Sequence, residues 1–340
     1  MAFKTSTGKL GHGKLDPYGF ERSEDFDEKT YEEFMSRYFL VLARRAARWR
    51  PLVVGKDTVI KSLKLKRFCR KGIPSEHRPL VWMEVSGAAE RMRDEPGLYK
   101  QLRSQYLDSS ITESIMLDIN RTFPENIYFA NERDPAGLQR PLKHVLMAFA
   151  LNNPHVGYCQ GLNFVAGLIL LILRNEEKAF WLLDTLARHI LPDYYTTDMI
   201  AIKAEQELCG ELIKWKLPDL YEHFNKAGVS WALIAMKWFI CLYADVLPVE
   251  TVLRIWDCLF YEGWKILLRV ALVLFVKNKA KLMAASDFSS IIDVVKGMVN
   301  DPVVVNCHTF MQSIFKDTGS MPRAKLHKLR EECIRHVLAS

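Results

Sequence analysis

The segments SIMLDINRTFPEN (residues 114–126) and PHVGYCQGLN (residues 154–163) are the most informative part of this 340-residue chain. In the first, Asp118 and Arg121 are three residues apart, so on a helix they lie one turn apart on the same face. In the second, Gln160 follows a proline- and glycine-containing loop. Both polar groups therefore lie at breaks between helices, where a side chain can project from the surface.

Arg121 is expected at the end of a short helix, because Pro124 cannot continue the helix and biases Phe123 away from helical geometry. The planar guanidinium of an arginine can contact several phosphate oxygens at once. Asp118 can hydrogen-bond this guanidinium and hold it in one rotamer. An isolated Asp-x-x-Arg is otherwise an ordinary surface pair worth a few tenths of a kcal/mol. The pair alone therefore does not decide between catalysis and surface chemistry.

Gln160 lies in a loop bracketed by Gly157 and Gly161, just before the strongly apolar helical segment 161–173. The N-terminus of such a helix has free N–H groups and a positive dipole end, which favour an anion. A neutral amide can donate to a phosphate oxygen and accept from a water molecule, which a charged side chain cannot do at once. The alternative is a glutamine that stabilises its own loop, and these residues alone leave both interpretations open.

The pattern I-x-x-D-x-x-R followed by Y-C-Q-G resembles the TBC domain, the catalytic module of GTPase-activating proteins for Rab-type small GTPases. Two more segments carry the resemblance, KGIPSEHRPLVW at residues 71–82 and LPVETVLRIWDCLFYEG at residues 247–263. Together the motifs cover roughly residues 71–266, in the family's order. The resemblance implies catalytic roles for Arg121 and Gln160, a finger-orienting role for Asp118, and a site loop that includes Tyr158, Cys159 and Gly161.

The outer motifs could orient the site or belong to it, but a structural role is favoured. Arg78 and Trp82 are four residues apart on one helix face, which favours packing of the tryptophan and a bond from the arginine to a carboxylate or carbonyl. Asp257 lies beside Trp256 and is expected to anchor a bond between helices. In the family that the motifs resemble, these positions and Arg254 are mainly structural as well.

The resemblance implies a protein that accelerates GTP hydrolysis on a Rab-family GTPase by supplying Arg121 and Gln160 in trans. It would be a catalytic activator of a partner rather than a stand-alone hydrolase, and the partner would carry the GTP and Mg²⁺. The chain has no G-x-x-x-x-G-K-[ST] loop, no G-x-S-x-G elbow and no H-E-x-x-H pair, so no cofactor or metal of its own is expected. The alternative is a non-catalytic adaptor or effector module that binds a Rab without turnover.

Composition limits the remaining function classes. The net charge of +7 is too small to indicate nucleic-acid binding, and no nucleic-acid-binding motif is present. Seven irregularly spaced cysteines, without a C-x-x-C pair, favour a reduced compartment. The longest uncharged apolar run, residues 162–173, is too short to span a bilayer. We expect a soluble, cytoplasmic protein with at most peripheral membrane association on membranes that bear the target Rab; nothing indicates an obligate oligomer.

Apolar residues recur at helical spacing from Phe68 onward, and period-two alternation is scarce, so an all-α, many-helix protein is expected. The TBC resemblance adds two helical subdomains. Three regions are predicted: an N-terminal extension over residues 1–66 with one amphipathic helix, a catalytic domain over 67–266, and helices over 267–340 that complete the fold.

Within the N-terminal extension, residues 1–25 are polar and expected to be disordered or loosely attached. A helix is predicted from about Thr30 to Trp49, ended by Pro51. Its basic end could be a solvated helix terminus or could touch acidic lipids or a partner. That basic end comprises Arg44, Arg45, Arg48 and Arg50.

Overall fold

The computed structural model describes residues 15–22, 26–131 and 134–339. Helices α1 to α18 and two short turns of 3₁₀ or π helix account for the regular structure of these residues. In the same ranges, the only isolated β-bridges join Leu15 to Glu21 and Phe20 to Asn126. The predicted all-α class is therefore confirmed.

The helices follow one another with short connections. Their bounds are α1 Glu28–Val53, α2 Leu63–Lys71, η1 Ser75–His77, α3 Arg78–Ser86, α4 Ala88–Asp94, α5 Leu98–Arg103, α6 Ser109–Ile119, α7 Gln139–Asn152, α8 Leu162–Leu173, α9 Glu176–Thr185, η2 Leu186–Ile190, α10 Ile200–Lys216, α11 Pro218–Lys226, α12 Trp231–Ile240, α13 Val249–Glu262, α14 Lys265–Ala284, α15 Phe288–Met298, α16 Pro302–Val305, α17 Cys307–Lys316 and α18 Arg323–Ala339.

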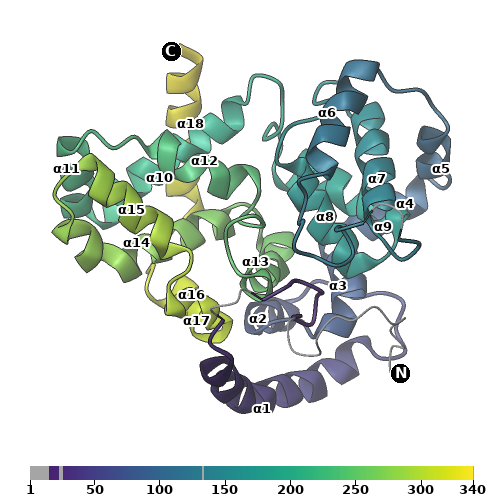
Figure 1. The fold of residues 1–340 in the computed structure, drawn as a ribbon, viewed down its shortest axis with the longest axis horizontal. Coiled ribbons are helices and arrows are strands. Elements are labelled where there is room, and N and C mark those ends of the chain that lie inside the picture. Colours follow the sequence, from purple (N-terminus) through teal and green to yellow (C-terminus); the bar gives the residue numbers. More distant parts are fainter. Residues whose placement is uncertain (1–14, 23–25, 132–133, 340) are drawn as a thin grey trace.

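The helices form two subdomains, as expected (Figure 1). In the first, α7, α8 and α9 pack against one another, with α4, α5 and α6 around them. In the second, α10 contacts α11, α12, α14 and α18, and α14 contacts α15 and α17. Helix α13 joins the two parts, because it packs on α2 and α3 as well as on α14 and α17.

Helix α8 shows how the sequence determines this arrangement. Its sequence LNFVAGLILLIL is apolar on all sides, which is typical of a helix enclosed by protein. Ten of its twelve residues are buried. Neighbouring helices begin at side-chain caps: Asp108 accepts from Ser110 N before α6, and Asn175 accepts from Lys178 N before α9. The helices α6 and α9, which precede and follow this core region in the chain, therefore begin at positions fixed by their own capping residues.

The predicted end of the first helix at Pro51 is wrong, since α1 continues through Pro51 to Val53. A proline inside a helix removes one backbone hydrogen bond and disturbs the carbonyl four residues earlier. That carbonyl belongs to Ala47, which is exposed. Water can satisfy the carbonyl there, and Val54 N still donates to Arg50 O at 3.0 Å.

The expectation of a loose N-terminal segment is also wrong for residues 15–22. Tyr18 donates from its hydroxyl to Glu250 and accepts from Arg78 Nη1 at 2.9 Å. The backbone carbonyl of Tyr18 accepts from Asn126 Nδ2 at 3.1 Å. This segment is part of the folded domain because it satisfies buried polar groups on three distant elements; residues 1–14 and 23–25 lie outside the described ranges.

Candidate active site

Arg121 lies two residues after the end of α6, with its backbone N–H donating to Asp118 O at 3.2 Å. Its guanidinium Nη2 lies 2.5 Å from Asp118 Oδ1. The Arg121 side chain is 52% exposed, whereas the Asp118 side chain is 6% exposed. A buried carboxylate therefore holds one edge of the guanidinium, and the rest of the group faces solvent.

The backbone just after Arg121 is fixed by Phe123. This residue has φ +48°, a left-handed conformation that costs a residue with a β-carbon roughly 1–3 kcal/mol. Its ring is buried and packs edge-on against Phe20, Phe129 and Phe164, with ring centroids 5.3 to 5.7 Å apart. Aromatic packing therefore offsets the strain and sets the direction in which the chain leaves α6.

Gln160 is exposed in the loop between α7 and α8, and Gly161 forms the N-cap of α8. Gly161 has φ +105°, and a β-carbon there would lie 3.1 Å from Ile240 Cγ1. Only glycine combines this backbone conformation with this close approach. The sharp turn presents Gln160 at the N-terminus of α8.

The two motifs meet at Asp118. While Oδ1 holds Arg121, Oδ2 accepts a hydrogen bond from the Tyr158 hydroxyl at 2.5 Å. Burial, and then the hydrogen bond to Asp118, raise the pKa of Tyr158, so its hydroxyl remains a donor at neutral pH. Tyr158 stands two residues before Gln160. One carboxylate thus connects the arginine to the loop that carries the glutamine.

Asn163 is a second link that the sequence motifs did not single out. Its amide oxygen accepts from Gly161 N at 3.1 Å, and its amide nitrogen donates to Thr122 Oγ1 at 2.9 Å. Thr122 in turn donates to Asp118 O at 2.6 Å. The available signal was a polar amide in the first turn of an otherwise apolar helix, because a buried amide needs partners.

Cys159 lies between these contacts, and its half-buried thiol has a pKa raised to about 11 by burial and by the charge of Asp118. The thiol is therefore protonated at neutral pH and poorly suited to nucleophilic catalysis. His155 is exposed and its carbonyl accepts from Thr197 Oγ1 at 3.5 Å. The geometry thus assigns neither residue a chemical step.

The outer motif residues lie together in the interior. Asp257 accepts from Arg78 Nε at 3.1 Å, from Trp82 Nε1 at 2.9 Å and from Ile73 N at 2.9 Å. Burial raises the pKa of Asp257, and the charges of Arg78 and Arg254 oppose this rise. These contacts join α3 to α13 and leave the Asp257 carboxylate away from the surface.

Arg254 and Trp256 extend this internal network. Arg254 donates to the Tyr38 hydroxyl at 3.2 Å and to Arg70 O at 3.2 Å. Trp256 Nε1 donates to Leu242 O at 3.0 Å. Tyr18, Tyr38 and Glu250 also belong to the network; no sequence pattern pointed to them, because their partners lie on remote parts of the chain.

Across the residues that the structure describes, no three His, Cys, Asp or Glu side chains are grouped so that they could hold a metal ion. In those same ranges, no helix combines the length and apolar character needed to cross a bilayer.

Comparison with known proteins gives consistent results. The family model described as the Rab-GTPase-TBC domain matches residues 75–283. Growth hormone-regulated TBC protein 1-A of Danio rerio is 48% identical over 334 residues, which cover 98% of this chain and 94% of that protein. Growth hormone-regulated TBC protein 1 of Homo sapiens is 48% identical over 326 residues, which cover 96% of each chain.

Among solved structures, the Chlamydomonas flagellar RabGAP TBC domain matches with a TM-score of 0.76 and 32% identity. The match covers 89% of this chain and 99% of that domain. The family match and the fold support a role of the Rab GTPase-activating type and imply interaction with Rab-family GTPases. On these grounds, the chain belongs to the Rab-GTPase-TBC domain family.

Proposed function

We propose that this protein accelerates GTP hydrolysis on a Rab-family GTPase by supplying Arg121 and Gln160 to the partner's nucleotide site. The observation that carries the proposal is the double contact of Asp118, whose two oxygens hold the Arg121 guanidinium and the Tyr158 hydroxyl. Both candidate catalytic side chains are exposed; the buried Asp118 holds the Arg121 guanidinium directly and holds the loop of Gln160 through Tyr158.

In the proposed mechanism, Arg121 neutralises the charge that develops on the phosphate oxygens during cleavage. An arginine supplied in trans accelerates such reactions by roughly 10³–10⁵. Its fixed guanidinium needs little reorganisation when the charge develops, which is the source of the stabilisation. Gln160 donates to a phosphate oxygen and accepts from the attacking water, so it orients the nucleophile. The partner supplies the GTP and Mg²⁺.

The second candidate is an adaptor that binds a GTP-loaded Rab without turnover. It would need Arg121 and Gln160 only as ordinary contact residues. The buried carboxylate behind Arg121 favours catalysis, because a binding surface has no need of a rotamer fixed by an internal carboxylate.

The test is single-turnover GTP hydrolysis across a set of purified Rabs, with Arg121→Ala and Gln160→Ala compared with the wild type. Arg335→Ala and Gln101→Ala are matched controls, because both residues are exposed and lie on α18 and α5, which carry no candidate catalytic residue. Catalysis predicts that both site variants lose stimulation and both controls keep it. If the wild-type protein accelerates GTP hydrolysis on none of the Rabs but binds one of them tightly, the adaptor is favoured.

A second experiment distinguishes the role of Gln160 from that of Arg121. In it, the Rab's own switch glutamine is replaced by leucine. If Gln160 positions the water, stimulation survives this change, because Gln160 occupies the place beside the nucleophile. If the Rab substitution abolishes turnover and Gln160→Ala is nearly silent, Gln160 is a loop residue and the chain supplies an arginine alone.

We further propose a cytoplasmic location, with peripheral association on the membranes that bear the target Rab, and a role in vesicle trafficking. Fluorescence imaging of the tagged protein, with and without the active Rab, tests this proposal.

A further inference from the structure

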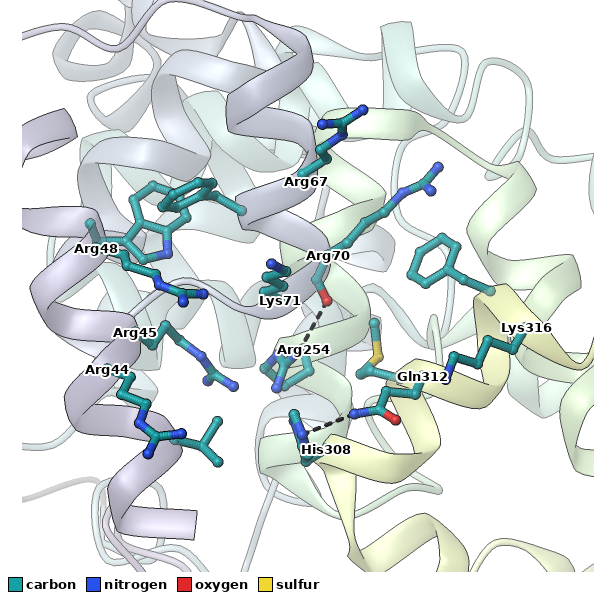
Figure 2. Close-up of a pocket in the computed structure, with 15 residues that line it drawn as sticks. Arg44, Arg45, Arg48, Arg67, Arg70, Lys71, Arg254, His308, Gln312 and Lys316 are labelled. Carbon is teal, nitrogen blue, oxygen red and sulfur yellow. Dashed lines mark hydrogen bonds between the residues drawn. The ribbon is translucent and has the colours of Figure 1, made fainter.

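A basic cavity of about 530 Å³ lies between α1, α2, α13 and α17 (Figure 2). Neither Arg121 nor Gln160 lines it. Its lining residues include eight arginines and lysines and no aspartate or glutamate. The cations are Arg44, Arg45, Arg48, Arg67, Arg70, Lys71, Arg254 and Lys316.

Helical spacing explains how so many cations reach one cavity. On α1, residues 41, 44, 45 and 48 follow the i, i+3, i+4, i+7 pattern of a single helix face. On α17, residues 308, 311, 312, 315 and 316 do the same. Figure 2 shows these two faces on either side of Arg254, which α13 supplies at the base.

The floor of the cavity holds two buried guanidinium groups close together. Arg45 is 6% exposed and Arg254 is 1% exposed. Both donate to one acceptor, the Tyr38 hydroxyl, at 3.1 and 3.2 Å. Both also pack over Gly72, since a β-carbon at that glycine would collide with the Arg254 guanidinium and lie 2.8 Å from Arg45 Nη1.

These two groups are incompletely satisfied. In the described part of the chain, Arg45 Nη2 and Arg254 Nε are buried and have no hydrogen-bond acceptor. Arg254 Nε lies 3.9 Å from Asp257 Oδ2, an ion-pair distance that is too long for a hydrogen bond. Burial, and next the charge of Arg254, lower the pKa of Arg45. Unpaired buried donors are rare in folded proteins and call for an explanation.

The nearby carboxylates do not neutralise this cluster. Asp257 already accepts from Arg78, Trp82 and Ile73, and Glu250 is engaged by Arg78 and Tyr18. Three buried guanidiniums, those of Arg45, Arg78 and Arg254, therefore share two carboxylates, which leaves one positive charge in excess.

The mouth of the cavity adds exposed cations. Arg44, Arg48 and Lys71 are exposed, and none of them has a carboxylate within ion-pair distance among the described residues. Arg70, in contrast, donates two hydrogen bonds of 2.6 Å to Glu262, so its charge is already paired with a carboxylate. The sides are apolar, with Trp49, Phe68 and Phe315.

We propose that this cavity binds a small anion bearing several phosphate groups, one of which bridges Arg45 and Arg254 while Arg44, Arg48 and Lys71 neutralise the others. Phosphate fits better than a single carboxylate, because its oxygens can accept from two guanidinium forks at once. The closed base and the volume suit a compact polyphosphorylated ring. This chemistry occurs both in phosphorylated lipid headgroups and in free inositol phosphates.

Two binding measurements on the whole chain distinguish the free inositol phosphate from the lipid headgroup. Isothermal titration calorimetry with inositol trisphosphate tests the free ligand. Flotation with vesicles that contain phosphatidylinositol bisphosphate tests the lipid, against phosphatidylserine vesicles of equal surface charge. We expect binding of the phosphorylated ring and stronger flotation with the bisphosphate lipid. Saturable binding of inositol trisphosphate without preferential flotation identifies a soluble ligand, and binding of both identifies the lipid headgroup.

Two sets of variants locate the site. Arg44→Gln/Arg48→Gln should weaken binding by roughly tenfold or more, whereas Lys100→Gln/Lys226→Gln, with the same loss of charge on exposed helical positions elsewhere, should not. Arg45→Met should also weaken binding. Its melting temperature should not fall, because the substitution removes one of two adjacent buried cations.

An equal loss of binding affinity in the two double variants would overturn the proposal, since it would mean that the ligand is attracted by net charge alone. Equal flotation with phosphatidylserine vesicles, without binding of inositol trisphosphate, would overturn it too, as would equally tight binding of a hexaglutamate peptide. If Arg45→Met fails to fold, the surface double variant still decides. Hydrolysis stimulated on a soluble Rab should be unchanged in that double variant, so this result stands apart from the proposed function.

Discussion

Both oxygens of the Asp118 carboxylate are committed, one to the Arg121 guanidinium and the other to the Tyr158 hydroxyl. The side chain is nearly enclosed, and a carboxylate in such a place needs donors for its oxygens, which these two groups supply. Its backbone carbonyl also accepts from Thr122 Oγ1. The residue is therefore a positioning residue whose effect on chemistry passes through other side chains.

Asp118→Ala should lower the rate constant for stimulated hydrolysis more than it weakens Rab binding. The arginine would lose its fixed rotamer, and with it a contact that forms fully only in the transition state. Single-turnover kinetics at several protein concentrations separate the two effects. A variant that changes affinity alone, or that unfolds, would show that Asp118 is only structural.

Tyr158→Phe should retain the Arg121–Asp118 pair and release the loop that carries Gln160. A buried hydrogen bond to a charged group is worth about 1.5–3 kcal/mol, so the rate should fall by roughly ten- to a hundredfold. Tyr106→Phe is the control, since Tyr106 is 83% exposed. Near-normal hydrolysis by Tyr158→Phe would mean that the loop is held by other contacts, such as those of Asn163.

At the scale of elements, the sequence predicted the helical class and the neighbouring positions of Arg121 and Gln160 at helix breaks. Short-range rules suffice there, because Pro124 and Gly161 act on their own backbone. The role of Asn163 was missed, since its partner Thr122 lies on another element. The position of Pro51 was misjudged because a proline in the last turn of a helix disturbs only one exposed carbonyl.

The contact between α2 and α13 has a defined pH dependence. Burial acts to raise the pKa of Glu262, but the hydrogen bonds and charges of Arg70 and Lys66 outweigh burial and hold the pKa below its ordinary value. A lowered folded-state pKa contributes stability above the unfolded value, and that stability is lost as the pH falls through the folded value. The contact should therefore be intact at neutral pH and lost in acid.

Glu262→Gln should accordingly lower the free energy of unfolding at pH 7 by roughly 1 kcal/mol, a modest value because Arg70 is partly exposed. The difference from the wild type should begin to narrow as the pH falls below the ordinary pKa of a glutamate, and it should vanish below the lower folded-state pKa, where the wild-type carboxylate has lost its charge. Urea unfolding at a series of pH values measures this. Glu222→Gln, at an exposed position on α11, is the control; a difference independent of pH would contradict the assignment.

At the scale of the whole molecule, contacts that are distant in sequence hold the predicted catalytic region in place. Trp49 Nε1 on α1 donates to Gly72 O at 2.9 Å, and Arg330 on α18 pairs with the buried Glu205 of α10 at 2.6 Å. Tyr18 reaches both Arg78 and Glu250. No local pattern encodes such pairs, so the sequence alone predicted both ends to be additions to the domain.

A fragment of residues 67–266 should therefore fail to fold cooperatively. It lacks Trp49, Tyr18 and Arg330, which contact Gly72, Arg78 and Glu205 in the whole chain. A buried carboxylate that loses its partner, as Glu205 does, typically destabilises a protein by about 3–5 kcal/mol. Circular dichroism melting of the fragment and of residues 15–339 tests the expectation. A sharp transition and full GTPase stimulation by the fragment would show that the terminal regions are accessory.

The left-handed turn at Phe123 has a consequence for the kinetics of association. Because three aromatic rings fix the backbone after Arg121, the entropy of ordering that segment is lost when the chain folds and not when a partner arrives. An incoming protein then meets a surface that needs little rearrangement, so encounters of suitable orientation can proceed directly to the bound complex. The segment after Arg121 is therefore ordered once, during folding, and does not have to be ordered again each time a partner binds.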